Sequence, residues 1–127
     1  MNIKTIIEVL KKEHEEIENR LKEFENLFRQ KLNYEQLLEV YNKLVKIWYY
    51  HEKKEDEIFK SKIKKEEREN LKLEHKSIKG HSEIIKKALD TEDRHHIKVV
   101  IDTDGRLLVN RLRNHMNKEN KIYNSLI

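Results

Sequence analysis

The sequence predicts an all-α protein: one antiparallel, up-down-up-down four-helix bundle formed by residues 1–127 as a single domain. Three observations lead to this prediction. The 127 residues include no proline and only two glycines, so helix formers dominate every part of the chain. Apolar residues recur in alternating steps of three and four, which is the spacing of helices that pack against one another. Few turn residues interrupt this spacing, so we expect long helices with short connections.

Turn residues and breaks in the apolar spacing give the expected limits of the helices. The first three helices are expected at about 3–29, 34–60 and 66–89. The turn Lys31-Leu32-Asn33 separates the first two, and a basic segment at 61–65 separates the second from the third. The fourth helix ends near Leu126. Its start has two candidates, Thr91-Glu92-Asp93 and Asp102-Thr103-Asp104-Gly105, because each segment carries residues typical of an N-cap.

Composition and charge exclude several classes of protein. The absence of cysteine excludes disulfides, thiolate-bound iron–sulfur clusters and a cysteine nucleophile. The 28 basic and 24 acidic residues leave a net charge of +4 and are interleaved, so we expect solvated helix faces and no nucleic-acid binding. The N-terminus becomes charged too early for a signal peptide, and no apolar run approaches the ~20 residues that span a bilayer. We therefore expect a cytoplasmic protein that does not bind membranes.

Six ionisable residues interrupt the apolar rows at positions that should face the core. Each expected helix has one histidine in its row: His14, His51, His75 and His115. In the second and fourth helices a glutamate follows four residues later, at Glu55 and Glu119. An ionisable side chain in a core costs several kcal/mol unless it is paired or bound to a metal. We therefore expect these six side chains to meet inside the bundle.

Residue counts from the turns test whether the histidines reach one height, since each helical residue adds about 1.5 Å along the axis. Counted in this way, His14, His51 and His75 lie at the same level. His115 lies about ten residues too far along the chain, so the segment after the third helix must bend, overhang or end before a new helix begins. We expect a restart near Asp102–Gly105, because threonine, aspartate and glycine are poor interior helix residues.

The ligand types and their spacing indicate two metal ions. Residues i and i+4 of a helix point the same way, so His51/Glu55 and His115/Glu119 each direct a nitrogen and a carboxylate inward. With the lone histidines of the first and third helices, the set holds four nitrogens and two carboxylates, too many for one tetrahedral zinc. It suits two metals, each bound by two histidines and sharing two bridging glutamates. Imidazole and carboxylate without sulfur favour iron, with manganese or zinc as substitutes.

The order of these residues resembles the hemerythrin-like (HHE cation-binding) domain family over essentially the whole chain. The matching elements are His14, His51-x-x-x-Glu55, His75 and His115-x-x-x-Glu119. The resemblance implies a hemerythrin-like four-helix bundle with two iron ions, oxo- or hydroxo-bridged, held by these six residues. The oxygen-carrying members have a further histidine in the third helix, where this chain has Lys79, and an aspartate five residues after the last histidine, where this motif ends instead at Glu119.

The four-histidine, two-glutamate set implies more open metals than those of the oxygen carriers. It is similar to the set of the iron-sensing F-box domain of mammals and of bacterial proteins that repair iron centres after nitrosative stress. The resemblance therefore implies a non-haem di-iron protein that binds dioxygen, another small diatomic ligand or peroxide, or senses oxygen, iron or redox state. An alternative is an oxidoreductase or iron-centre repair protein that acts on peroxide or nitric oxide. A third hypothesis is a metal-free helical interaction module, and whether the protein is an enzyme stays open.

Residues beside the six ligands carry less specific predictions. Glu52 lies about 100° from the apolar row, so we expect it in solvent or supporting a ligand, with a role as an additional anionic ligand as the alternative. Trp48 is expected in the core and as a wall of the metal pocket, and Tyr123 is expected in the core. The other three histidines fall outside the rows and are expected at the surface: His81, His95 and His96.

Overall fold

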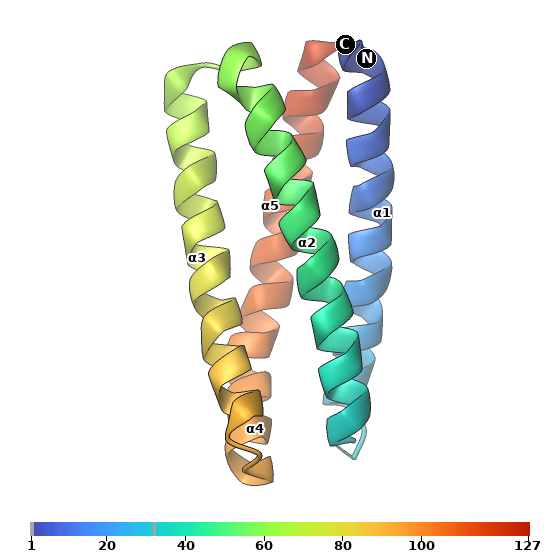
Figure 1. Ribbon diagram of the computed structural model, residues 1–127, viewed down its shortest axis with the longest axis vertical. Helices are drawn as coiled ribbons and strands as arrows, with labels where there is room; N and C mark the ends of the chain where they lie inside the picture. Colours follow the sequence, from blue (N-terminus) through green and yellow to red (C-terminus); the bar gives the residue numbers. More distant parts are fainter. Residues whose placement is uncertain (1, 32) are drawn as a thin grey trace.

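The computed structural model describes residues 2–31 and 33–127, so Leu32 of the predicted first turn lies outside the described residues. Within these ranges the helical elements are α1 (Ile3–Phe28), α2 (Tyr34–Lys62), α3 (Lys65–Asp90), α4 (Arg94–Val100), the π-helical segment η1 (Ile101–Gly105) and α5 (Arg106–Leu126). Figure 1 shows α1, α2, α3 and α5 side by side in alternating directions, with both termini at one end. The predicted all-α four-helix bundle is confirmed.

Asparagine or aspartate side chains cap the start of three helices. Asn2 and Asn33 accept the backbone N–H three residues later, at 2.9 and 3.1 Å, and so cap α1 and α2. Asp93 accepts the N–H groups two and three residues later and caps α4. These caps satisfy donors that have no partner within the helix.

Among the helices that the structure describes, none is both long and apolar enough to cross a bilayer.

A layer of polar side chains divides the apolar core into two clusters. The smaller cluster lies near the two termini and consists of Ile7, Leu10, Phe59, Leu71 and Tyr123. The larger cluster fills the bundle from the polar layer to the opposite end. On α1, for example, His14 lies between Leu10 of the smaller cluster and Ile17 of the larger one. The polar layer is therefore enclosed by hydrocarbon along the axis of the bundle.

Beyond the polar layer, the buried rows of α2 and α5 are displaced by one residue from the predicted rows. The spacing predicts Ile58 and Ile122 in the core, but both are only partly buried. Phe59 and Tyr123 are the buried residues, with 4% and 0% of their surface exposed. A straight α-helix has 3.6 residues per turn, slightly more than the average step of a row that alternates threes and fours. Such a row gradually turns away from the core. The buried row stays on the core side because it takes two steps of four in succession here.

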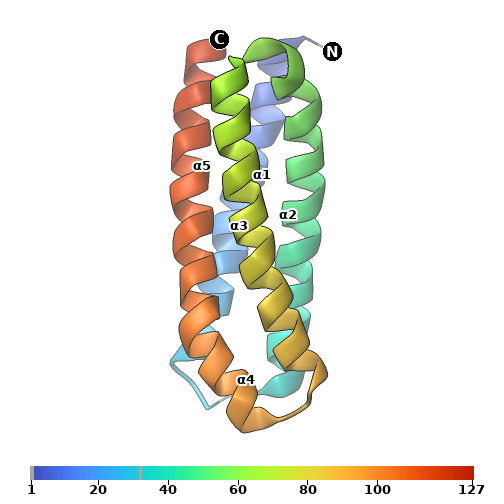
Figure 2. The same ribbon diagram turned by 90° about the vertical axis from the view of Figure 1, so that its left-hand side faces the viewer.

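The predicted restart of the fourth helix is wrong, because the chain stays helical from Arg94 to Leu126. The wider π-helical turn of η1 replaces the break, and Figure 2 shows α4 at the end of the bundle away from the termini. The Thr103 hydroxyl donates to the carbonyl oxygens of Val99 and Val100, at 3.0 and 3.3 Å, within this irregular turn. Gly105 packs so close to Phe28 that an added Cβ would lie 3.3 Å from its ring. These contacts explain why poor helix formers are tolerated here.

Candidate metal centre

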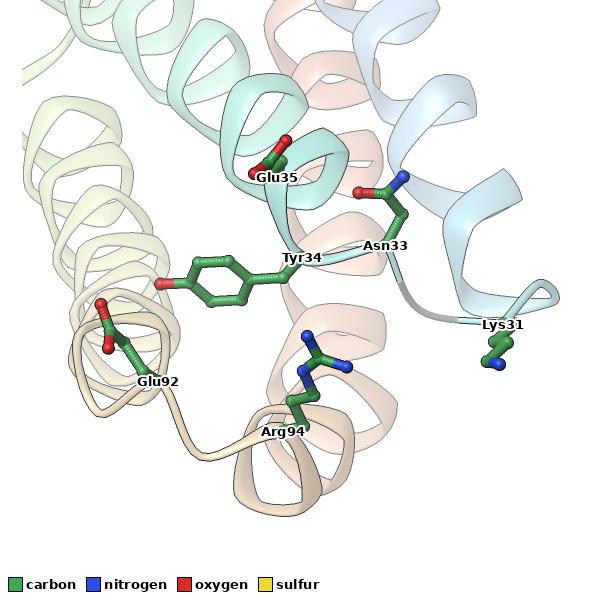
Figure 3. Close-up of a pocket in the computed structure, with 6 residues that line it drawn as sticks. All are labelled: Lys31, Asn33, Tyr34, Glu35, Glu92 and Arg94. Atoms are coloured by element: carbon green, nitrogen blue, oxygen red, sulfur yellow. The ribbon is translucent and has the colours of Figure 1, made fainter.

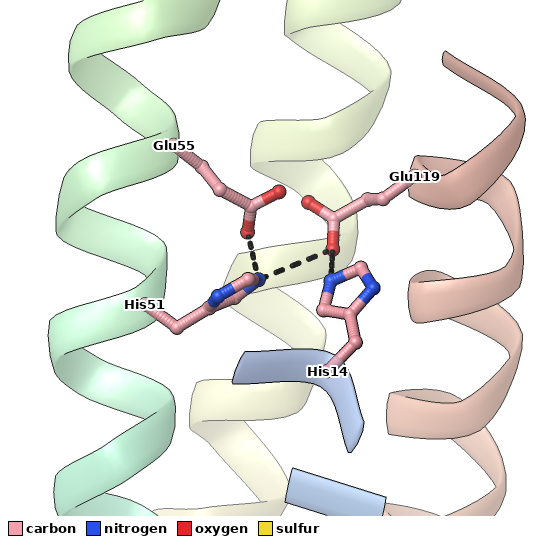
Figure 4. A group of neighbouring side chains, drawn as sticks. All are labelled: His14, His51, Glu55 and Glu119. Carbon is pink, nitrogen blue, oxygen red and sulfur yellow. Dashed lines mark hydrogen bonds and ion pairs between the residues drawn. The ribbon is translucent and has the colours of Figure 1, made fainter. Parts of the chain in front are cut away.

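The six residues predicted to bind metal converge in the polar layer. His14 comes from α1, His51 and Glu55 from α2, His75 from α3, and His115 and Glu119 from α5. All six are buried, and the most accessible of them, His75, exposes 6% of its surface. Figure 4 shows four of these side chains pointing toward one another between the helices. None of the six side chains therefore serves as a solvated surface group.

One group of four donors lies toward α1 and α2. His14, His51, Glu55 and Glu119 place one ligand atom each within 4.8 Å of one another. His51 Nε2 lies 2.9 Å from Glu55 Oε1, and His14 Nε2 lies 3.2 Å from Glu119 Oε1. We call these four residues the first half-site. Its two nitrogens and two carboxylates form a donor set typical of iron, manganese or zinc.

A second group of four donors lies toward α3 and α5. The second half-site consists of Glu55, His75, His115 and Glu119, which also place one ligand atom each within 4.8 Å of one another. His75 Nε2 and His115 Nε2 are 2.8 Å apart, and His115 Nε2 lies 3.2 Å from Glu119 Oε2. Both glutamates belong to both half-sites, and Glu119 directs one oxygen toward His14 and the other toward His115. This sharing is the arrangement that two bridging carboxylates require.

Several donor atoms of the layer are buried without a hydrogen-bond partner among the described residues. These atoms are His51 Nε2, Glu55 Oε1 and Glu119 Oε2. His51 Nε2 and Glu55 Oε1 are close, but their geometry is not that of a hydrogen bond. Buried polar atoms are almost always paired, because an unpaired one costs about 1–3 kcal/mol. Convergent, unpaired nitrogen and oxygen donors fit bound metal cations, so the residues present match the group that the sequence predicts.

The outer nitrogen of each histidine contacts a polar side chain from a neighbouring helix. Nδ1 of His14, His51, His75 and His115 lies 2.8, 3.1, 3.2 and 2.5 Å from an oxygen of Asn120, Glu13, Glu52 and Glu74, respectively. An Nδ1–H donated outward leaves Nε2 as the inward lone pair that binds a metal. These four residues, which we call the outer ring, therefore fix the orientation of the imidazoles.

The outer ring was predicted only in part. Glu52 supports His75, which agrees with its expected supporting position. Sequence reasoning missed Glu13, Glu74 and Asn120 as functional residues. A signal was present, because every outer-ring residue is adjacent in sequence to a ligand, as in Glu13-His14. Adjacent helical residues differ by about 100°, so such a neighbour points toward the next helix while the ligand points inward.

Burial and charge shift the pKa values of the two glutamates in opposite directions in the metal-free protein. Burial raises the pKa of Glu55 well above its ordinary range, and the negative charge of Glu119 adds to the rise. Burial opposes ionisation of Glu119 as well, but Glu55 and the surrounding imidazoles outweigh it and hold the pKa of Glu119 well below its ordinary range. For His51, burial lowers the pKa but the two glutamates prevail, raising it to about 10. The layer thus couples carboxylates and imidazoles that a bound cation would require in their deprotonated forms.

Two aromatic side chains, Tyr123 and Trp48, contact different members of the half-sites. The Tyr123 hydroxyl donates to Glu55 Oε2 at 2.5 Å and lies 3.4 Å from His14 Nε2. Tyr123 is therefore in the core, as predicted, and also contacts a ligand. Trp48 lies against three of the histidine rings, with centroid distances of 5.8, 5.8 and 5.6 Å to His51, His75 and His115. Its predicted position as a wall of the metal pocket agrees with these contacts.

The three histidines expected at the surface differ from one another. His95 and His96 are exposed, in agreement with that expectation. His81 is partly buried, and its Nδ1 lies 3.0 Å from Asp104 Oδ1 in η1, so the surface prediction is wrong for this residue. The carboxylate that holds His81 belongs to the irregular turn, whose position the helical spacing does not specify.

The depression shown in Figure 3 lies away from the polar layer, where the start of α2 meets the start of α4. It is lined by Lys31, Asn33, Tyr34, Glu35, Glu92 and Arg94. None of these belongs to the six ligands or the outer ring. Tyr34 instead helps to close the end of the bundle, because its hydroxyl donates to the carbonyl oxygen of Leu89 at 2.6 Å.

A comparison with protein families agrees with the geometry of the polar layer. The family model described as the hemerythrin HHE cation-binding domain matches residues 3–127. Searches of curated proteins and of solved structures gave no match. The match supports cation binding, and the buried histidines and glutamates fit a metal site. The chain therefore belongs to the hemerythrin HHE cation-binding family.

Proposed function

We propose that this protein is a non-haem di-iron protein that binds dioxygen, or that senses oxygen, iron or redox state. The supporting observation is the pair of half-sites that share both glutamates. In this proposal the four histidines are terminal ligands, two on each iron, and Glu55 and Glu119 bridge. Two ferrous ions held in this way would supply electrons and open coordination positions for a small ligand such as dioxygen.

The protein's own side chains hold, orient and insulate the centre. The outer ring keeps the Nδ1 atoms engaged, so all four Nε2 atoms face inward. Two ionised glutamates offset half of the charge of two ferrous ions, which lowers the cost of holding them in a buried layer. Trp48 covers three of the histidine rings, and the two apolar clusters enclose the centre along the axis of the bundle. Enclosure of this kind would limit exchange of the metals and their ligands with solvent.

An iron count tests the proposal. The purified protein is made metal-free, loaded with Fe(II) without oxygen and freed of excess metal before the iron is measured. We expect two irons per chain. A value near one, or below it, would contradict a binuclear centre, and no bound metal would favour a helical interaction module.

An oxidoreductase or iron-centre repair protein that acts on peroxide or nitric oxide is the second candidate. The observation that favours it is the number of protein donors, since each half-site offers four and a six-coordinate iron accepts two more ligands. A reversible absorption change on cycling oxygen supports ligand binding. Consumption of peroxide or nitric oxide over many turnovers supports the enzyme instead.

A further inference from the structure

Of the grooves that are lined by one of the four histidines, two lie on opposite sides of the bundle. One lies between α1 and α5 and is lined by His14. The other lies between α2 and α3 and is lined by His75, two apolar side chains and the charged residues Asp56, Lys60, Arg68 and Lys72. We call the second one the α2–α3 groove. Its volume is about 250 Å³, below the roughly 300–1,000 Å³ of pockets for drug-sized ligands, so a small occupant suits it.

The two grooves differ in charge. In the α1–α5 groove, Lys11 and Lys22 are balanced by Glu15 and Glu18. In the α2–α3 groove, three cationic side chains face a single carboxylate, that of Asp56. Cations that line a concave surface raise the local concentration of small anions. Of these two grooves, the one beside His75 therefore favours an anion on the basis of its charges.

Arg68 supplies a second observation that points to an anion. Its Nη1 donates to the carbonyl oxygen of Lys60 at 2.8 Å, which holds the side chain against the end of α2. Its Nε is buried and has no hydrogen-bond partner among residues 2–31 and 33–127. A buried donor without an acceptor is costly, and a charged donor more so. An anion in the groove would supply the missing acceptor.

We propose that the α2–α3 groove binds a small inorganic oxyanion, with the Arg68 Nε–H as hydrogen-bond donor and Lys60 and Lys72 as neutralising charges. The bound anion would lie beside His75, on the side of the second half-site. This inference deepens the proposed function and rests on it. The groove would concentrate small anionic ligands next to one metal of the proposed pair.

Nitrate is a suitable probe, because it is a small oxyanion and a weak metal ligand. The Nε–H resonance of Arg68 in the metal-free protein is followed by ¹⁵N NMR while nitrate replaces chloride at constant ionic strength. We expect a saturable shift of this resonance and of amides in the groove. No shift, or the same shift with chloride, would overturn the proposal.

Variants separate the groove from general attraction of anions. Arg68→Gln is expected to weaken nitrate binding about tenfold or more, the effect of losing one charged hydrogen bond. Lys22→Gln in the α1–α5 groove is the matched control and should leave nitrate binding unchanged. Equal nitrate binding by the wild type and Arg68→Gln, measured from the groove amides, would also overturn the proposal.

Arg68→Gln also removes the hydrogen bond from Arg68 to the carbonyl oxygen of Lys60, so a further variant is needed that keeps this bond. Lys72→Gln keeps that bond and should still weaken nitrate binding severalfold, without a change in melting temperature. If Lys72→Gln binds nitrate as tightly as the wild type, the groove is not the anion-binding site. Failure of the anion-site proposal is distinct from failure of the proposed function. Nitrate binding is measured in the metal-free protein, and the iron count is measured without nitrate.

Discussion

The first and second half-sites contain the same ligands in the same order, yet their surroundings differ. Each has a lone histidine on one helix and a His-x-x-x-Glu pair on the next. Both imidazoles of the second half-site contact outer-ring carboxylates, whereas His14 of the first contacts the neutral amide of Asn120. Among the four histidines, Tyr123 lies beside His14 of the first half-site, and the helix that carries His115 follows the irregular turn η1.

This comparison teaches that the ligands and their surroundings have separate tasks. In the proposed di-iron centre, the duplicated residues would specify two metals, while their surroundings would decide how strongly each is held. A carboxylate that accepts the Nδ1–H makes the opposite nitrogen more basic than an amide does. We therefore expect the second half-site to bind its metal more tightly than the first.

Removal of a shared ligand should have the largest effect. Glu119 lies within 4 Å of three imidazole nitrogens, those of His14, His51 and His115. Glu119→Ala should abolish both metals, a larger loss than the roughly 10–100-fold in affinity that supporting residues contribute. Metal content after Fe(II) loading measures it, with the exposed Glu57→Ala as control. Retention of one tightly bound iron would show that one half-site does not depend on Glu119 and would contradict its role as a shared ligand.

Removal of a single histidine should separate the half-sites. His115→Ala should cost about tenfold or more in metal affinity and lower the melting temperature of the metal-loaded form only, because metal stabilises the native state by mass action. His14→Ala should cost less, since Asn120 supports it less strongly. Competition with a chelator gives both affinities, and His96→Ala should match the wild type. A larger loss in His14→Ala would reverse the proposed ranking.

Exchange of outer-ring residues should have a smaller effect and test its cause. Glu74→Gln removes the charge behind His115 and should weaken metal binding by about tenfold. Asn120→Asp adds a charge behind His14, which has only a neutral amide there, and should strengthen binding at the first half-site. Titration of the metal-free protein with Fe(II) measures both changes. If Asn120→Asp weakens binding, the ranking of the half-sites by outer-ring charge is wrong.

The convergence of the six candidate ligands could be predicted, because each stands in an apolar row where a charged side chain is costly. The outer ring could not be, because Glu13 and Glu74 lie off those rows and resemble solvated glutamates. Their function depends on which helix lies beside which, a property of the assembled bundle. The π-helical turn escaped prediction for the same reason. Thr103, Asp104 and Gly105 are poor in a regular helix, but the distant residues Phe28 and His81 supply contacts that only the fold brings near.

The metal-free protein should lose stability as the pH rises above neutrality. The pKa of His51 is about 10 in the folded protein and 6.5 ordinarily, so the folded state binds more protons between these values. The stabilisation is complete below pH 6.5 and is lost as the pH approaches 10. The raised pKa of Glu55 acts in the same direction. Melting temperatures across this range should fall less steeply in His51→Gln, and an equal slope would contradict this source.

The smallest predicted effect concerns η1, the irregular turn that precedes α5, the helix of His115 and Glu119. Gly80 lies within α3 with open space where a Cβ would stand, so Gly80→Ala should stabilise the protein by about 0.5–1 kcal/mol. Gly105→Ala gains the same helix propensity but sets a Cβ 3.3 Å from the buried Phe28 ring, so it should be less stable than Gly80→Ala. Chemical denaturation of the metal-free variants gives both values. If Gly105→Ala is as stabilising as Gly80→Ala, close packing against Phe28 is not what selects glycine in this turn.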